Sequence, residues 1–325
     1  YRVIAPDGEV SGGPMYVLER GLGARWLGLL FALFTALAAF GIGNMVQANS
    51  ISDMMTGSFG VPAWITGAAL ACLTGFVILG GIKSIARFCE RLVPFMAVVY
   101  VLGCLIVLAV NWERLPGAVE LILSSAFSGH AAVGGFLGAG MRETMRFGIA
   151  RGLFSNESGL GSAPIVAAAA QTTNPVRQAL VSSTGTFWDT VVVCLVTGLV
   201  IVSSGDWQAG LTGAALTKSA FAHIPYIGPA VLTFGLLTFV FSTILGWEYY
   251  GEKAAEYLLG RRAVKPYRWL WIAAVMAGSV AALPAVWNFA DIFNGLMAVP
   301  NLVSLLLLAP VIAAETRTHI GEPLD

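Results

Sequence analysis

Residues 26–52 read WLGLLFALFTALAAFGIGNMVQANSIS, and no residue between Arg25 and Asp53 carries a charge. A bilayer core about 30 Å thick needs about 20 mostly apolar residues for each helix that crosses it. The stretch is long enough for such a helix, and similar charge-free stretches recur along the chain, one of them between Arg268 and Asp291. We therefore predict an all-α polytopic membrane protein.

The composition agrees with a membrane protein. Hydrophobic residues make up 57% of the chain and charged residues 11%, whereas soluble domains carry about 25% charge. The 38 glycines and 14 prolines favour closely packed or broken membrane helices. Because the net charge is zero, the chain offers no general attraction to nucleic acid, and we expect the lipid bilayer as its surroundings.

The sequence shows no catalytic or cofactor motif. Its four cysteines have neither metal-ligand nor redox spacing, and the motifs HExxH, GxSxG, GxxxxGK[ST] and GxGxxG do not occur. An intramembrane enzyme would need a catalytic dyad or a metal cluster inside its helices. We therefore predict that the protein is not an enzyme and uses no cofactor.

Eight membrane-spanning helices are predicted from the charge-free stretches. They cover residues 26–52, 62–82, 92–112, 131–150, 178–202, 228–250, 269–286 and 290–314. The helix at 131–150 is the least apolar of these, because it holds Arg142, Glu143 and Arg146.

Basic residues are divided unequally between the loops that join these helices. With eight spans, 16 of the 18 Lys and Arg residues fall on one side of the membrane, and only Arg114 and Lys218 fall on the other. Loops rich in Lys and Arg stay in the cytoplasm, so this side, with residues 1–25 and both ends of the chain, is predicted to be cytoplasmic. The predicted location is the cell inner (plasma) membrane.

The first predicted helix carries carboxamides on one face. Asn44 and Gln47 are three positions apart, so their side chains share a face, and Asn49 lies close to it. Carboxamides both donate and accept, as a zwitterionic solute requires. The alternative interpretation is hydrogen bonding between helices.

The helix at 131–150 begins with four glycines between Gly134 and Gly140. Glycine disfavours a continuous helix, and broken helices at mid-membrane expose backbone groups that bind solutes and cations. We predict an interruption near Gly138–Gly140. The alternative is a face of small residues at Gly134 and Gly138 that packs closely on another helix.

Two further polar groups lie inside predicted helices. Asp189 lies near the middle of the helix at 178–202, where a carboxylate indicates a functional site, with Thr186 and Thr190 as local partners. Its alternative role is structural, satisfied by hydroxyl and backbone groups. Ser242 and Thr243 offer adjacent hydroxyls to a cation, although such residues more often bond the carbonyl four positions earlier in their own helix.

The connection from Arg151 to Gln171 contains Ser162 and Pro164, which predict the cap and first turn of a short helix. An apolar helix on the cytoplasmic face has to pack on the other helices. We expect an ordered loop that closes the inner end of a pathway or that supports the bundle.

Several motifs resemble one known family, the alanine or glycine:cation symporters. They are Ser11-Gly-Gly-Pro-Met-Tyr16, Gly43-Asn-Met-Val-Gln-Ala-Asn-Ser50, Gly80-Gly-Ile-Lys-Ser-Ile-Ala86, Arg151-Gly-Leu-Phe-Ser-Asn-Glu-Ser-Gly-Leu-Gly-Ser-Ala-Pro164, Trp188-Asp-Thr190 and Gly246-Trp-Glu-Tyr-Tyr-Gly251. The resemblance covers nearly the whole chain, and the string Ser155-Asn-Glu-Ser-Gly-Leu-Gly-Ser162 is highly specific.

The resemblance implies the bacterial leucine-transporter fold, in which five helices are repeated with inverted topology. The chain would be one transmembrane domain over residues 1–325. Residues 1–25 would form a cytoplasmic loop, residues 26–130 the last three helices of the first repeat, and residues 131–325 the second repeat. Because the chain starts with Tyr1, we expect an N-terminally truncated piece that lacks the family's first two helices, which supply much of the solute and sodium site.

The resemblance also assigns site residues. Asn44, Gln47 and the backbone of Gly138, Gly140 and Met141 would contact the solute. Ser242 and Thr243 would bind sodium, and Asp189 lies near a second cation site in relatives of the fold.

The expected function is sodium-coupled symport of a small neutral amino acid, alanine or glycine, by alternating access. Alternatives are coupling to protons, transport of another amino acid such as glutamine, a channel, or a solute-binding scaffold. Saturable uptake would separate a transporter from a channel.

Overall fold

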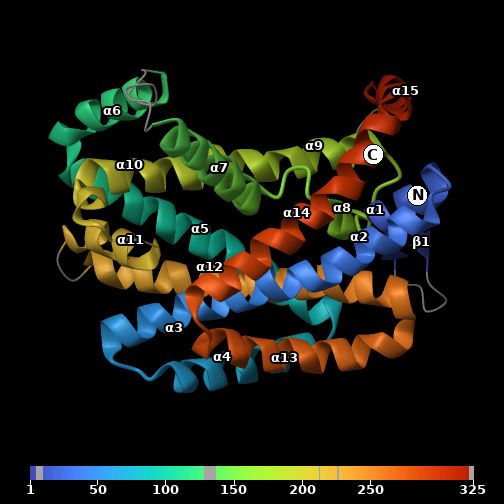
Figure 1. Cartoon of the computed structure of the whole chain (residues 1–325), viewed down its shortest axis with the longest axis horizontal. Helices are drawn as coiled ribbons and strands as arrows, with labels where there is room; N and C mark the ends of the chain where they lie inside the picture. The colour runs from blue at the N-terminus through green and yellow to red at the C-terminus, as the bar shows by residue number, and fades with distance from the viewer. Residues whose placement is uncertain (5–9, 128–136, 212, 225–226, 322–325) are drawn as a thin grey trace. The chain divides into compact units, whose positions relative to one another are not determined.

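The computed structural model describes residues 1–4, 10–127, 137–211, 213–224 and 227–321 (Figure 1). The chain forms two compact units. The first unit comprises Tyr1–Phe88, Glu157–Thr186 and Val240–Asp325, and the second comprises Cys89–Asn156 and Phe187–Phe239.

The first unit is helical apart from a short hairpin of β1 (Val3–Ile4) and β2 (Val10–Ser11), in which Val3 pairs antiparallel with Ser11. Its helices are α1 (Pro14–Tyr16), η1 (Val17–Gly21), α2 (Arg25–Ala38), η2 (Ala39–Met45), α3 (Val46–Phe59), α4 (Ala63–Ile78), α8 (Ala163–Ala167), α9 (Pro175–Thr186), η7 (Arg261–Ala263), α13 (Val264–Val280), α14 (Leu283–Leu307) and α15 (Ala309–His319).

The second unit contains η3 (Trp112–Arg114), α6 (Leu115–Phe127), α7 (Leu137–Asn156), η5 (Phe187–Cys194), α10 (Leu195–Ser204), η6 (Asp206–Ala209) and α11 (Gly213–Ala222). The long helices α5 (Ile82–Val110) and α12 (Ile227–Leu259) each contribute residues to both units.

Five helical runs in the described part of the chain are long and apolar enough to cross a membrane. They are Arg25–Phe59, Ile82–Val110, Pro175–Ser204, Ile227–Leu259 and Pro284–Leu307. These runs agree with the predicted multi-pass membrane protein, whereas the count of eight stays a prediction. With 16 and 17 residues, α4 and α13 lie near the lower end of the length that a spanning helix needs, about 17–25 residues.

Glycines bring the helices of the first unit into close contact. A Cβ atom at Gly43 would lie 2.0 Å from the Cβ of Trp247 on α12, and one at Gly278 would lie 2.5 Å from the Cα of Met45. In Figure 1, α13 runs beside α4. Membrane helices associate largely through such packing of small residues, because lipid provides little hydrophobic driving force between them.

The second unit has its own apolar core. It consists of Tyr100, Cys104, Val107, Leu108, Val200, Ala220, Phe221 and Leu232. The ring of Tyr100 stacks on that of Phe221, and its hydroxyl lies 2.9 Å from the Thr197 hydroxyl. The one polar atom that Tyr100 brings into this core is therefore hydrogen-bonded, as burial requires.

The structure corrects the prediction of an interrupted helix near Gly138–Gly140. α7 is a continuous α-helix from Leu137 to Asn156. Glycine near its start costs about 1 kcal/mol per residue relative to alanine, which weakens a helix without preventing it. Gly134 and Gly135 lie outside the described residues.

The short helix predicted after Ser162 is confirmed as α8, with Pro164 in its first turn. The predicted cap is wrong in one respect. The Ser162 hydroxyl caps no backbone N–H and instead donates to Glu157 Oε2 at 2.5 Å. A charge-assisted hydrogen bond to a carboxylate is stronger than a neutral cap, which accounts for this choice.

The N-terminal hairpin holds α8 in place. The guanidinium of Arg2 donates to the carbonyl oxygens of Ala168, Ala170 and Thr172 at 3.3, 2.8 and 3.3 Å. These carbonyls belong to the segment that follows α8, so Arg2 ties the start of the chain to that segment. The part of the expected ordered connection from Glu157 to Gln171 is therefore observed within the first unit.

We predict that Gly43→Val lowers the free energy of unfolding by about 1–3 kcal/mol, because the new side chain would overlap Trp247. Gly57→Ala is the matched control, since no atom lies within 4 Å of a Cβ at that position. Thermal unfolding of both purified variants measures the difference. Equal melting temperatures for the two variants would contradict the packing described here.

Candidate functional site

Two of the predicted site residues lie in π-helical segments. η2 holds Asn44 between α2 and α3, and η5 holds Asp189 between α9 and α10. A π-helix pairs residues five apart instead of four, and such segments occur frequently at functional sites. Both polar side chains thus sit where the regular helix is interrupted.

Asn44 is fully buried in the first unit. Its Nδ2 donates to the carbonyl oxygen of Trp271 on α13 at 2.9 Å. Its Oδ1 has no hydrogen-bond partner among the described residues. Asn44 therefore links two helices, and it also keeps an acceptor that a solute N–H group can use.

The neighbouring carboxamides bond to backbone. Asn49 donates to the carbonyls of Gly278 and Ala281 at 3.1 and 2.9 Å, which matches the alternative of hydrogen bonding between helices. Gln47 is half-buried and donates to the carbonyl of Ile42 in its own helical run at 3.0 Å. Its role as a solute contact stays a prediction.

Asp189 lies in the second unit with a set of hydroxyl partners. Ser155 Oγ lies 2.9 Å from each carboxylate oxygen, and Thr190 Oγ1 lies 3.1 Å from Oδ2. Asn156 donates to Thr190 Oγ1 at 3.3 Å. Thr190 is confirmed as a partner of Asp189. Ser155 was not predicted as a partner, although it begins the string Ser155–Ser162 that resembles the family. Hydroxyl and carboxylate oxygens are the ligand types that a hard cation prefers.

Ser242 and Thr243 are half-buried on α12 in the first unit, followed by the buried Ile244 and Leu245. Further along the same helix lie Trp247 and Glu248. The two hydroxyls are polar groups in an apolar stretch, as a site for a small cation requires. Their assignment to sodium stays a prediction.

Residues 157–162 of the string Ser155–Ser162 form a fixed loop in the first unit. Glu157 adopts a left-handed backbone conformation with φ 57°, which is uncommon for a residue other than glycine. Its Oε1 accepts a hydrogen bond from Trp247 Nε1 at 2.8 Å, and its Oε2 accepts one from Ser162. These hydrogen bonds of Glu157 were not predicted from the sequence, because a charged residue in a loop is usually exposed to water.

The same loop is fastened to α14 and α2. Asn301 Nδ2 donates to the carbonyl of Gly159 at 2.9 Å. Gly161 has φ +94°, and a Cβ there would lie 2.7 Å from Phe31 and 2.9 Å from Asn301. At Gly161 only glycine fits both the conformation and the space, whereas at Gly159 the positive φ of 81° favours glycine.

Gly138, Gly140 and Met141 lie in the first turns of α7. Their backbone groups are part of a helix there, whereas the prediction needs them to face a solute. The hydrogen bonding of a continuous helix occupies most of its backbone groups, so a contact at this place depends on the unpaired N–H groups of the first turn.

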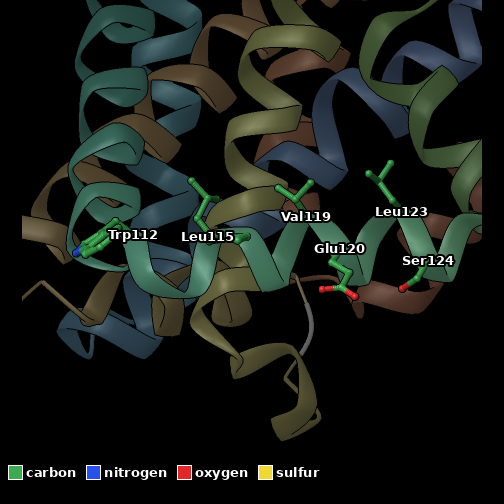
Figure 2. A pocket seen from close by; sticks show the side chains of 7 residues that line it. Trp112, Leu115, Val119, Glu120, Leu123 and Ser124 are labelled. Carbon is green, nitrogen blue, oxygen red and sulfur yellow. The ribbon is translucent and has the colours of Figure 1, made fainter.

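A hollow of about 740 Å³ runs along η3 and α6 and contains none of the predicted site residues. Figure 2 shows Leu115, Val119 and Leu123 on one side of α6 and Glu120 and Ser124 on another. All five side chains are partly or fully exposed. The hollow is therefore an outer surface of one helix and not a solute site.

Within the described ranges, no group of three or more His, Cys, Asp or Glu side chains is placed to hold a metal ion. A transition metal is held by such clusters.

Comparison with known proteins identifies the relatives of this chain. The profile of the family described as the sodium:alanine symporter family matches residues 1–322. The sodium/alanine symporter AgcS of Methanococcus maripaludis is 50% identical over 325 residues, which cover 98% of this chain and 71% of that protein.

More distant relatives carry other names. The amino-acid carrier protein AlsT of Bacillus subtilis is 37% identical over 310 residues, covering 94% of this chain and 65% of the relative. A protein of the same organism named "Probable sodium/glutamine symporter GlnT" is 38% identical over 311 residues, covering 95% and 64%. The matched proteins are named as transporters, and the solutes in their names differ.

We predict that Trp247→Phe releases the loop at 157–162, because it removes the indole N–H that bonds Glu157. Losing one of the hydrogen bonds to the half-buried Glu157 carboxylate costs about 1 kcal/mol. Amide hydrogen exchange over these residues should become at least about fivefold faster. Trp64→Phe is the control, since Trp64 is 60% exposed. Unchanged exchange in Trp247→Phe would show that the bond does not hold the loop.

Proposed function

The chain belongs to the sodium:alanine symporter family, and on this premise we propose that it carries a small neutral amino acid inward together with sodium. The observation that supports this most is the 50% identity, over 98% of the chain, to a protein named a sodium/alanine symporter. Amino-acid symport with a cation follows from the family. Alanine or glycine as the solute is the proposal.

The proposed mechanism is alternating access in the inverted-repeat leucine-transporter fold. Residues 26–130 would supply the last three helices of the first repeat and residues 131–325 the second repeat. No covalent bond changes. A membrane potential of 100 mV contributes about 2.3 kcal/mol for each positive charge that moves inward, and the sodium gradient adds to this.

The solute is proposed to bind carboxamide and backbone groups. Asn44 Oδ1 is a buried acceptor without a partner in the described part of the chain, so an ammonium or amide N–H of a solute would satisfy it. Gln47, Gly138, Gly140 and Met141 are proposed as further contacts.

Sodium is proposed to bind at Ser242 and Thr243, with Asp189 as a separate cation ligand. Hydroxyl and carbonyl oxygens match the hard sodium ion. A proton would instead need a titrating carboxylate, and Asp189 is the candidate for that alternative.

The proposed setting is the inner membrane, with the ends of the chain and its basic loops in the cytoplasm. All Lys and Arg residues but Arg114 and Lys218 fall on that side of the predicted topology. Transport of glutamine is the second candidate, because a relative at 38% identity carries that solute in its name.

We predict that replacing both Ser242 and Thr243 with Ala raises the sodium concentration for half-maximal uptake by about 30-fold in the complete protein. Losing two cation ligands at about 1 kcal/mol each accounts for this magnitude. Uptake of labelled alanine at graded sodium concentrations measures it. The Thr316→Ala and Thr318→Ala double variant is the control, since it loses two hydroxyls that bond their own helix. Equal sodium dependence in both variants would remove the assignment.

We predict that Asp189→Asn reduces sodium-driven uptake at least about tenfold while the protein still inserts and unfolds normally. The amide keeps the size of the side chain but loses the charge that balances a cation. Asp53→Asn, at an exposed position, controls for the loss of one charge. Normal sodium-driven uptake by Asp189→Asn would give Asp189 a structural role only.

A further inference from the structure

The first unit contains a cavity of about 540 Å³ that is separate from the candidate site residues. It lies where the turn after α4 meets η7 and the start of α13. The residues that carry its chemistry are Gly80, Gly81, Arg261, Arg262, Lys265 and Arg268. Four cationic side chains thus surround one hollow.

The acidic residues of this cavity already have cationic partners. Arg268 donates to both carboxylate oxygens of Glu252, at 2.5 and 3.0 Å. Lys253 donates to Glu256 at 2.9 Å, and Arg261 lies 3.8 Å from the same carboxylate. Both carboxylates are therefore compensated, and Arg261 and Arg268 are engaged in doing so.

Arg262 and Lys265 are the other two cationic residues that line the cavity. Both are exposed, and the structure gives neither an ion pair within its described ranges. Arg262 and Lys265 line the same cavity, whose two carboxylates already face Arg261, Arg268 and Lys253, so their charges have no assigned counterion in the described wall. Two positive charges at the wall of one hollow therefore indicate an anionic ligand.

The surroundings of the cavity are apolar and exposed. Leu79 at its wall is 51% exposed, and Leu259, Trp269 and Leu270 nearby in the chain are 75%, 61% and 60% exposed. Tryptophan is enriched at the level of lipid headgroups. An anion that binds here lies beside the exposed apolar side chain of Leu79 in the cavity wall, a neighbour that a soluble anion does not need.

We propose that this cavity binds the phosphate headgroup of an anionic membrane lipid. Arg262 and Lys265 contact the phosphate, and the exposed side chains of Leu79 and Leu270 contact the acyl chains. Basic pockets between membrane helices on the cytoplasmic side bind such headgroups, and the predicted topology places the loop from α12 to α13 on that side. The site does not depend on the proposed transport activity.

The test measures lipid binding to the complete protein in detergent by native mass spectrometry. Phosphatidylglycerol is titrated against the protein and against the Arg262→Gln, Lys265→Gln double variant. Each basic group near the surface strengthens the attraction to anionic lipid, so the apparent affinity should fall about tenfold or more in the variant. Phosphatidylcholine should bind both proteins equally weakly.

The control is the Arg20→Gln, Arg317→Gln double variant. It removes two exposed charges of the same predicted side that do not line the cavity. Its affinity for phosphatidylglycerol should stay within about twofold of the unchanged protein. Equal losses in the two double variants would overturn the proposal, because a general surface charge would then explain the binding.

A soluble competitor separates the two sources of phosphate. Inorganic phosphate and glycerol phosphate should not displace the bound lipid at equal concentration. Displacement by either would assign the cavity to a soluble anion and would overturn the lipid assignment. If the double variant fails to fold, Lys265→Gln alone is measured against Arg317→Gln, with an expected loss of about threefold.

Discussion

Hydrocarbon offers no hydrogen-bond partner, and this constraint governs every polar group that the membrane-spanning helices carry. Helices satisfy the backbone internally, which explains why helices make up most of the described structure. Side chains have to be satisfied by other helices. Asn44 and Asn49 do so by donating to backbone carbonyls of Trp271, Gly278 and Ala281, so polar residues connect the helices of the first unit.

Where the constraint is met only in part, the structure indicates function. Asn44 keeps an acceptor without a partner in the described ranges, and Asp189 has the hydroxyls of Ser155 and Thr190 as hydrogen-bond partners. Both lie in π-helical segments, where the regular backbone ladder changes its pairing. A symporter of this family needs such places, because its solute and its cation have to find polar groups inside the membrane.

The charge-free stretch at 26–52 was sufficient to predict the helical run Arg25–Phe59, since membrane helices are coded by local composition. The short helix α8 and the Thr190 partner of Asp189 were also predicted from near neighbours. The bonds from Trp247 to Glu157 and from Ser155 to Asp189 were not, because they join residues far apart in the sequence. The π-helical segments were missed as well, since composition does not distinguish a five-residue pairing from a four-residue one.

The central claim is that a sodium gradient drives the uptake of a small neutral amino acid. The most direct measurement is the accumulation of labelled alanine in vesicles that contain the complete protein. We predict saturable accumulation above the outside concentration with an inward sodium gradient and none with potassium in its place. Accumulation driven equally by a proton gradient without sodium, or uptake that never exceeds equilibrium, would contradict it.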